Sequence, residues 1–184
     1  SNTVVNTIVL DVKSDNGHLL YDSAIPEVEM LKNERIKYDT QTLMDFKEEF
    51  DIYLIGRVVA FQDPIFSRVY PESAITDIKT NRPYSQDSQY FLDPSDSNSR
   101  EYILNVALEA CLLGFDEIQF DYIRYPDTSY QGLVYDEKSS FENRTKNINS
   151  FLQNATDILH DNGCLVSADI FGYVLNSKND NGIG

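Results

Sequence analysis

Positively charged residues are scarce in this chain of 184 residues. It has 15 lysines and arginines against 30 aspartates and glutamates, which gives a formal net charge of −15 at pH 7. Nucleic acids and anionic membrane surfaces both require a basic face on a protein partner. The charge therefore argues against either partner, and it suits neutral or cationic ligands.

Residues that bind transition metals or build disulfide frameworks are also few. The chain has two histidines and two cysteines, and neither Cys111 nor Cys164 belongs to a CxxC or histidine-rich cluster. This scarcity argues against a zinc site and against a disulfide framework. We expect both cysteines to be small buried apolar residues, and we expect no metal or other cofactor.

Long hydrophobic runs and nucleotide-binding motifs are missing as well. No apolar run reaches the ~18 residues of a membrane span, so membrane insertion is not expected. No GxGxxG or Walker pattern follows an apolar segment, which removes support for nucleotide binding. The chain opens almost directly on a strand-like segment without a secretory leader, so its first residues do not identify a compartment.

Strand-like and helix-like segments alternate along the chain. Apolar, β-branched runs predict strands at 4–12, 52–61, 116–123 and 164–174, and capped helical periodicity predicts helices at 39–50, 97–114 and 139–163. This alternation is typical of an α/β fold with a parallel sheet, and the length fits a single domain over 1–184. The passage 64–97 is longer than ordinary connections, which suggests a functional loop.

Charged residues lie at the carboxyl end of every predicted strand. They are Asp11 and Lys13, then Asp63, then Asp121 and Arg124, and finally Asp169. In (β/α) barrels this rim holds the active site. A buried aspartate without a partner is costly, so the structural alternative for Asp121 is an ion pair with Arg124.

Three segments carry a resemblance to a known family. “NTIVLDVKSDNG” (6–17), “GFDEIQFDYIRYP” (114–126) and “VSADIFG” (166–172) are similar, in this order, to a bacterial family of glycoside-hydrolase-like barrel domains, catalogued as a domain of unknown function. The resemblance covers essentially the whole chain. It implies a parallel (β/α) TIM-type barrel, carbohydrate hydrolysis and an extracytoplasmic or cell-envelope location.

The resemblance also implies that the chain holds about strands two to five of the eight in a barrel. Asp121 would then end the fourth strand and Asp169 the fifth. A complete barrel needs ~250 residues, so we expect an incomplete barrel in this chain. Open sheet edges invite pairing with another chain, which makes self-association a further expectation.

One departure from the family concerns tryptophan. Family members often carry Trp just before “DP”, whereas this chain has Phe91 and Leu92 there and no tryptophan at all. A platform for stacking on a sugar ring would have to come from tyrosine or phenylalanine. We expect Tyr122, Tyr125 and Tyr173 to serve in this way, although each could equally be packing.

The implied chemistry requires two carboxyl groups. We expect Asp121 to be the nucleophile or base, kept ionised by Arg124 or Lys13, because a nearby cation lowers a carboxylate pKa. Asp169 has drier neighbours and is the expected general acid, with a residue beyond Gly184 as the alternative. The expected substrate-binding residues are Asp11, Lys13, Arg57, Asp63, Tyr122, Arg124, Tyr125 and Tyr173.

Several of these residues also have a structural interpretation. Asp11 could pair with Lys13 or Arg57 as scaffolding of the rim, and Asp63, which precedes a proline, could cap a turn. We expect Glu117 to alternate away from Asp121, as a helix-facing or bottom-side group.

Two other functions remain open on the sequence. One is a carbohydrate-binding barrel that uses the same rim without catalysis. The other is a metal-dependent hydrolase or deacetylase with Asp11, Asp121 and Asp169 as oxygen ligands. The scarcity of histidine weakens the second, because imidazole is the usual companion ligand of zinc.

Overall fold

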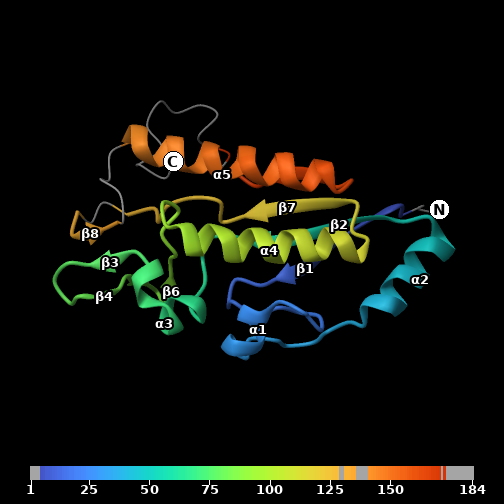
Figure 1. Ribbon diagram of the computed structural model, residues 1–184, viewed down its shortest axis with the longest axis horizontal. Helices are drawn as coiled ribbons and strands as arrows, with labels where there is room; N and C mark the ends of the chain where they lie inside the picture. The colour runs from blue at the N-terminus through green and yellow to red at the C-terminus, as the bar shows by residue number, and fades with distance from the viewer. Residues whose placement is uncertain (1–4, 129–130, 136–140, 171, 173–184) are drawn as a thin grey trace.

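The computed structural model of the protein describes residues 5–128, 131–135, 141–170 and 172 (Figure 1). Four strands form one parallel sheet in the order β1-β2-β7-β9, as the alternating sequence pattern predicts. The elements are β1 (Thr7–Lys13), α1 (Pro26–Leu31), α2 (Thr40–Phe50), β2 (Tyr53–Val59), α3 (Phe66–Val69), the 3-10 helix η1 (Pro71–Ser73), β3 (Thr76–Asp77), β4 (Arg82–Pro83), β5 (Ser85–Gln86), β6 (Gln89–Tyr90), α4 (Ser97–Leu113), β7 (Glu117–Asp121), β8 (Leu133–Val134), α5 (Phe141–Asp161) and β9 (Leu165–Ala168).

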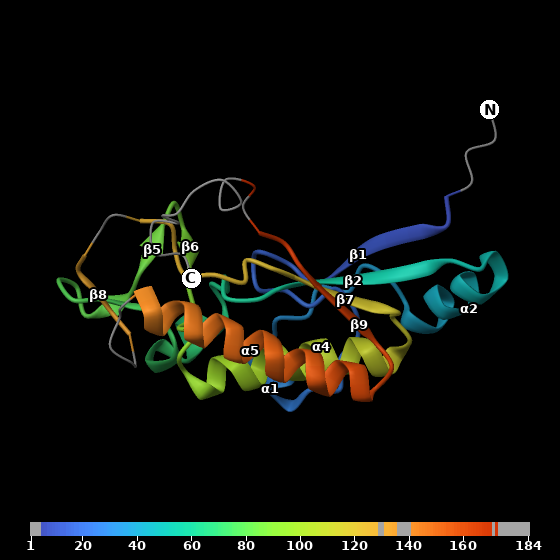
Figure 2. The ribbon, with the colours of Figure 1, turned by 90° about the horizontal axis from the view of Figure 1, so that it is seen from above.

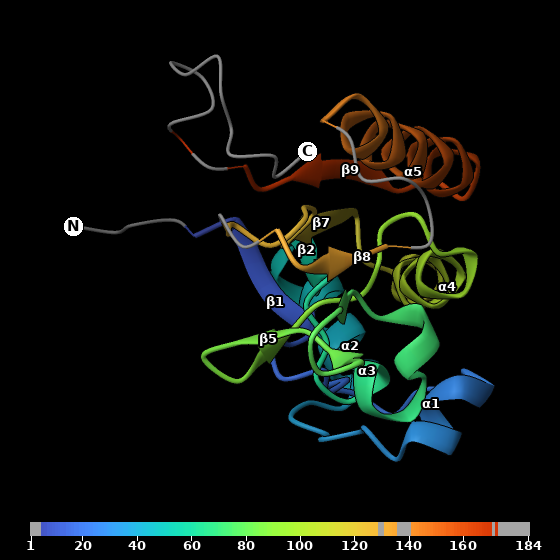
Figure 3. The same cartoon turned by 90° about the vertical axis from the view of Figure 1, so that its left-hand side faces the viewer.

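Helices cover one face of the parallel sheet. α4 and α5 lie side by side across it, as the views from above and from the carboxyl ends of the strands show (Figures 2 and 3). Ile118 and Phe120 of β7 point into this layer and are fully buried. Phe120 packs edge-on against Phe151 of α5, with 5.5 Å between the ring centroids. The main core therefore lies between the sheet and these helices.

The opposite face of the sheet carries no helix in the part of the chain that the structure describes (Figure 2). Glu117, Gln119 and Asp121 lie half-buried on this open face, in alternation with the buried residues of β7. The expectation that Glu117 alternates away from Asp121 is wrong, because strand positions four apart share a face. Glu117 is nevertheless at the amino-terminal end of the strand, as a bottom-side group would be.

α2 begins and α4 ends where the sequence signals indicate. The predicted start of the third helix, at residue 139, lies outside the described residues. Asp39 caps α2, and its Oδ1 accepts a hydrogen bond from the backbone N–H of Thr42 at 2.8 Å. Gly114 ends α4 with a φ of 111°, a left-handed conformation that glycine adopts without strain. α1 is an additional helix that the sequence patterns did not predict.

The passage 64–97 is not one irregular loop. It contains α3, η1 and the short antiparallel pairs β3–β4 and β5–β6. The turn between β5 and β6 places Asp87 and Ser88 at φ 51° and 66°, the left-handed conformations that suit a two-residue hairpin. This hairpin stands at the carboxyl end of the sheet, on the side of the open face (Figure 2).

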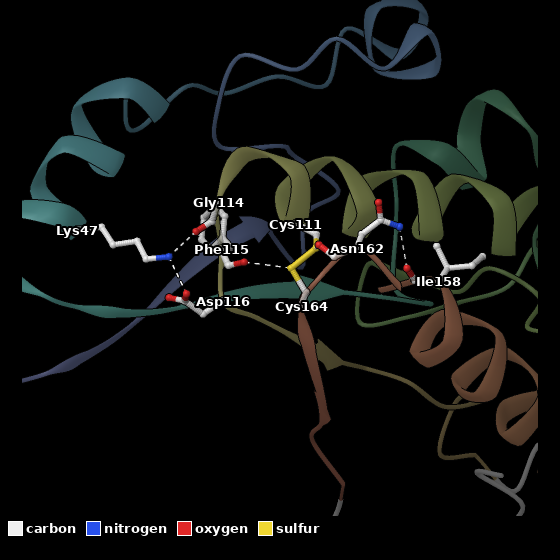
Figure 4. The surroundings of a disulfide bond; sticks show 8 residues. All are labelled: Lys47, Cys111, Gly114, Phe115, Asp116, Ile158, Asn162 and Cys164. Carbon is white, nitrogen blue, oxygen red and sulfur yellow. Dashed lines mark hydrogen bonds and ion pairs between the residues drawn. A yellow bond between two sulfur atoms is a disulfide. The ribbon is translucent and has the colours of Figure 1, made fainter. Parts of the chain in front are cut away.

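A disulfide joins Cys111 to Cys164, with 5.9 Å between the Cα atoms (Figure 4). The prediction of two separate apolar cysteines is wrong in this respect, although both side chains are buried as expected. The two residues are 53 positions apart and meet because β7 and β9 are neighbours. That adjacency brings the last turn of α4 against the residue before β9, at the amino-terminal end of the strands, and sequence spacing does not reveal it.

Candidate functional site

An arginine on the open face joins two of the predicted aspartates. Arg57 of β2 donates from Nη1 to Asp11 Oδ1 at 2.8 Å. It also donates to Asp121 Oδ2, from Nε at 3.0 Å and from Nη2 at 2.5 Å. Arg57 pairs with Asp11 in the β1–β2 register, and Asp121 ends the next strand, so three parallel strands meet in this cluster.

The two aspartates keep the guanidinium of Arg57 protonated. Burial alone would lower the pKa of Arg57, but the hydrogen bonds and negative charges of Asp11 and Asp121 outweigh it and raise that pKa above its ordinary value. The guanidinium stays positive at any working pH. The three side chains therefore carry one net negative charge when both carboxyl groups are ionised, and charge-assisted bonds of this kind are short and strong.

Asp169 lies directly after β9, beside this cluster. Gln119 of β7 donates from Nε2 to Asp169 Oδ1 at 3.2 Å. Asp169 and its neighbours Ala168 and Ile170 are exposed, so the expectation of drier neighbours for Asp169 is wrong. The pKa of the Asp169 carboxyl is nevertheless raised above its ordinary value by partial desolvation and by the negative charge of Asp121, while Arg57 opposes both effects. Asp169 thus retains its proton to higher pH than an isolated aspartate, which is the property of a general acid.

The backbone around Asp121 is unusual. Tyr122 has a φ of 50°, a conformation that bulky residues rarely adopt. Asp121 Oδ1 accepts a hydrogen bond from the N–H of Tyr122 at 2.7 Å, while its other oxygen faces Arg57. Non-glycine residues in such conformations cluster at functional sites. Both oxygens of this carboxylate are consequently fixed in position.

Arg124 makes different contacts from those predicted. Its guanidinium lies over the ring of Tyr122, 5.2 Å from the centroid, and 6.0 Å from the centroid of Phe91. Its Nη1 donates to the backbone oxygen of Tyr125 at 3.1 Å. The ion-pair partner of Asp121 is Arg57, so the expectation that Arg124 or Lys13 neutralises Asp121 is wrong.

Lys13 and Asp63 lie on the other side of the sheet from this cluster. They form an ion pair of 3.0 Å with both side chains fully buried, and Lys13 also donates to the backbone oxygen of Val59 at 2.8 Å. Asp63 Oδ1 accepts from the N–H of Ile65 and of Phe66, which is the turn-capping role. The β1 register shifts between Asp11 and Lys13, so Lys13 turns inward. In this structure neither side chain reaches the surface, so both serve the scaffold rather than a ligand.

The predicted aromatic platform is reduced to one described tyrosine. Tyr125 is 2% exposed, and its hydroxyl accepts a hydrogen bond from Asn147 Nδ2 at 3.0 Å, so it belongs to the core. Tyr122 is half-buried at the rim. Tyr173 lies outside the described residues.

A second polar cluster lies on the open face toward the amino-terminal ends of the strands, and the sequence analysis missed it. Tyr53 donates from its hydroxyl to Glu117 Oε2 at 2.9 Å, and the hydroxyl of Ser167 donates to Glu117 Oε1. Burial and the bond to Glu117 raise the pKa of Tyr53 to about 12. Correct strand parity from Asp121 would have found Glu117, and the parallel register from Gln119 would have found Ser167.

Among the residues that the structure describes, no group of three or more His, Cys, Asp or Glu side chains is arranged to hold a metal ion, and Asp11, Asp121 and Asp169 do not form one. No helix among these described residues is long and apolar enough to span a membrane.

Comparison with known proteins gives one family match and several structural neighbours. The family model described as “Putative glycosyl hydrolase domain” matches residues 1–184. A hypothetical protein from Ruminiclostridium thermocellum is 34% identical, with a TM-score of 0.80 over 92% of this chain and 86% of its own. No curated protein matches the chain.

More distant neighbours share the fold. Ega3 of Aspergillus fumigatus, solved in complex with galactosamine, has 11% identity and a TM-score of 0.55 over 97% of this chain. An α-galactosidase from Lactobacillus brevis has 10% identity and a TM-score of 0.58 over 89% of this chain. The chain spans 64% and 22% of these two proteins. With the four-stranded parallel sheet, these likenesses identify a partial (β/α) barrel of TIM type, as the sequence predicts.

Proposed function

The chain belongs to the family described as “Putative glycosyl hydrolase domain”, and we propose that it hydrolyses glycosidic bonds with Asp121 and Asp169. The observation that carries this proposal is the unequal environment of two carboxyl groups at the ends of neighbouring strands. Asp121 bonds to a guanidinium, whereas the pKa of the exposed Asp169 is raised by partial desolvation and by the charge of Asp121. Glycosidases require such a difference, with one carboxylate ionised and one carboxylic acid protonated.

The roles follow from these environments. Asp169 protonates the oxygen of the leaving group, and Asp121 supplies the negative charge that attacks or that stabilises the positively charged transition state. Arg57 keeps Asp121 oriented through two donated hydrogen bonds. Gln119 holds Asp169 Oδ1, so it is a positioning residue.

The substrate side of the proposal is a polysaccharide or oligosaccharide. Tyr122 lies at the rim beside Asp121, and an aromatic ring there can pack against the C–H face of a sugar. Ega3 is described with galactosamine and the Lactobacillus brevis protein as an α-galactosidase. These names support a carbohydrate as the ligand class.

We also propose an extracytoplasmic location. The disulfide between Cys111 and Cys164 supports it, because disulfides persist in oxidising compartments and are rare in reducing ones. The family resemblance points the same way.

The proposal extends to self-association. β1 and β9 are the outer strands of the described sheet, and each has one unpaired edge. Val9 and Leu165, on the open face of these strands, are 49% and 56% exposed. Exposed edges beside apolar side chains favour association of chains.

The test of the catalytic proposal is Asp121→Asn. We expect kcat on a panel of glycosides to fall by roughly 100-fold or more, because the amide removes the charge that stabilises the transition state. Asp45→Asn is the matched control, since it makes the same substitution at an exposed carboxylate of α2, away from the rim. Thermal melts show whether each variant is folded.

Two outcomes would count against the proposal. Turnover per folded molecule that is unchanged in Asp121→Asn would remove Asp121 from the chemistry. Binding of glycans without turnover in the unmodified protein would instead favour the carbohydrate-binding alternative.

Asp169→Asn should lose activity on substrates whose leaving group must be protonated, and activity should return on substrates whose leaving group needs no protonation.

A further inference from the structure

A surface cleft lies in the connection between β2 and α4. Its volume is about 570 Å³, and its walls come from α3, η1 and the small hairpins β3–β4 and β5–β6. Sites for small ligands usually measure ~300–1,000 Å³. The residues of the wall that matter for the argument are Arg68, Asp77, Arg82, Tyr84 and Tyr90.

The cleft is tied to the carboxyl end of the sheet. Asp63, just after β2, donates from its N–H to the backbone oxygen of Tyr90 at 3.0 Å. The next residue, Phe91, lies under the guanidinium of Arg124, which also covers Tyr122 beside Asp121. The wall of the cleft is therefore connected to the rim by consecutive contacts.

Two arginines line the cleft, Arg68 and Arg82. Among the residues that the structure describes, no side-chain hydrogen bond or ion pair ties the guanidinium of Arg68 or of Arg82 to another group, and both residues are exposed. By contrast, Arg57 is bound to two aspartates. In a chain with twice as many acidic as basic residues, two unpaired guanidinium groups at one cleft are conspicuous.

The remaining lining suits a sugar ring. Tyr84 and Tyr90 offer aromatic surface, and Thr80 and Ser85 offer exposed hydroxyl groups. Asp77 contributes one negative charge, and its Oδ1 already accepts the N–H of Lys79 at 2.7 Å. Two guanidinium groups against one carboxylate leave the cleft with a net positive charge.

We propose that this cleft binds a sugar unit that carries an anionic group, a carboxylate or a sulfate. The planar fork of a guanidinium matches such oxyanions with two parallel hydrogen bonds. The proposal rests on the proposed function, because it makes the cleft a subsite for an acidic unit of the polymer whose bonds are cleaved at the rim. It identifies the substrate class as an acidic glycan.

The test is a binding titration followed by the backbone amide signals of the ¹⁵N-labelled chain. The probes are a galacturonate trisaccharide, a sulfated galactose trisaccharide and a neutral galactose trisaccharide. We expect one or both acidic probes to shift the amides of Ser85 and Tyr90, and to bind at least about tenfold tighter than the neutral probe. Whichever acidic probe binds tighter identifies the anionic group.

The variant R68Q/R82Q should weaken binding of the acidic probe about tenfold or more, and R35Q should leave it unchanged. Arg35 is also exposed but lies outside the cleft. All three side chains are exposed, so these substitutions should leave the fold intact. The amide spectrum of each variant verifies that it is folded. Equal binding of neutral and acidic probes, unaltered binding by R68Q/R82Q, or no shift at the cleft would overturn the inference.

The titration measures binding and not turnover, so a failure of the cleft proposal can be distinguished from a failure of the proposed hydrolase function. Cleft binding without hydrolysis of any glycan would refute catalysis and leave the cleft assignment standing. Hydrolysis of neutral glycans without binding of any probe at the cleft would support catalysis and refute the cleft assignment.

Discussion

Asp121 and Asp169 end neighbouring strands, yet their electrostatic surroundings differ. Asp121 receives two hydrogen bonds from Arg57 and one from the backbone of Tyr122. Asp169 receives one from the neutral amide of Gln119 and faces the negative charge of Asp121. Two like charges at close range favour protonation of the group with less compensation. The charge of Asp121 therefore makes Asp169 harder to ionise.

This difference leads to a prediction about titration. The carboxyl carbon of Asp169, followed by NMR, should titrate above the ordinary aspartate pKa in the unmodified chain, and at lower pH in Asp121→Asn, where the repelling charge is gone. An unchanged titration in Asp121→Asn would contradict the coupling. Asp45→Asn is the control: it alters an exposed carboxylate of α2 and should leave the titration of Asp169 unchanged.

The same shift has a consequence for stability. A carboxyl group whose pKa is higher in the folded state than in the unfolded state favours folding at pH below its unfolded pKa, and this contribution is lost as pH rises through the folded pKa. Asp169→Asn should therefore raise the melting temperature at neutral pH and have no such effect under strongly acidic conditions.

Individual residues show what the sequence could and could not predict. Asp121 and Asp169 were placed correctly because they follow apolar runs, and the ends of parallel strands meet at one edge. Arg57 was not identified as the partner of Asp121, because a contact between strands is invisible to sequence spacing and Arg124 was nearer in the chain. Lys13 was misplaced because a shift in strand register reverses the side to which a residue points.

At the level of elements, the sequence predicted the four long strands and the three long helices. α2 and α4 carry recognisable caps, the three helices have periodic apolar residues, and the strands are rich in β-branched residues. The short pairs in the passage 64–97 were not predicted, because strands of two residues have too few positions to show a period. That passage forms the cleft, so the sequence alone did not reveal the second candidate site.

The disulfide joins two elements that the sequence analysis treated separately. It closes a loop of 53 residues that contains β7 and α5. In the chain-entropy account, a cross-link over a loop of this length stabilises the folded state by about 4 kcal/mol. We expect C111A/C164A to lose about this free energy of unfolding in urea titrations.

A control with reducing agent distinguishes the effect of the cross-link on stability from the effect of replacing two buried side chains. Reducing agent should destabilise the unmodified chain and leave C111A/C164A unchanged. Equal urea midpoints for the oxidised, reduced and double-alanine chains would show that the cross-link has no effect on stability.

The whole molecule has a covered face and an open face. Helices shield one side of the sheet, while Val9 and Leu165 are exposed on the other at the two outer strands. We expect light scattering after size exclusion to show a mass above that of one 21.1 kDa chain, increasing with concentration. V9K/L165K should lower that mass, because charges at sheet edges oppose pairing.

V69K provides the matched control for this experiment. Val69 is 48% exposed but belongs to α3, away from the sheet edges, so its substitution should not alter the mass. A chain that stays monomeric at all concentrations would contradict self-association.

The disulfide and the carboxylates occupy opposite ends of the same strands. Most substitutions lower stability, and selection removes only those that bring a protein below its threshold for folding. A cross-link remote from the rim gives the rim loops a wider tolerance for change without altering their chemistry. For directed evolution of new specificity in the passage 64–97, chains that keep the cysteine pair are therefore the better parents.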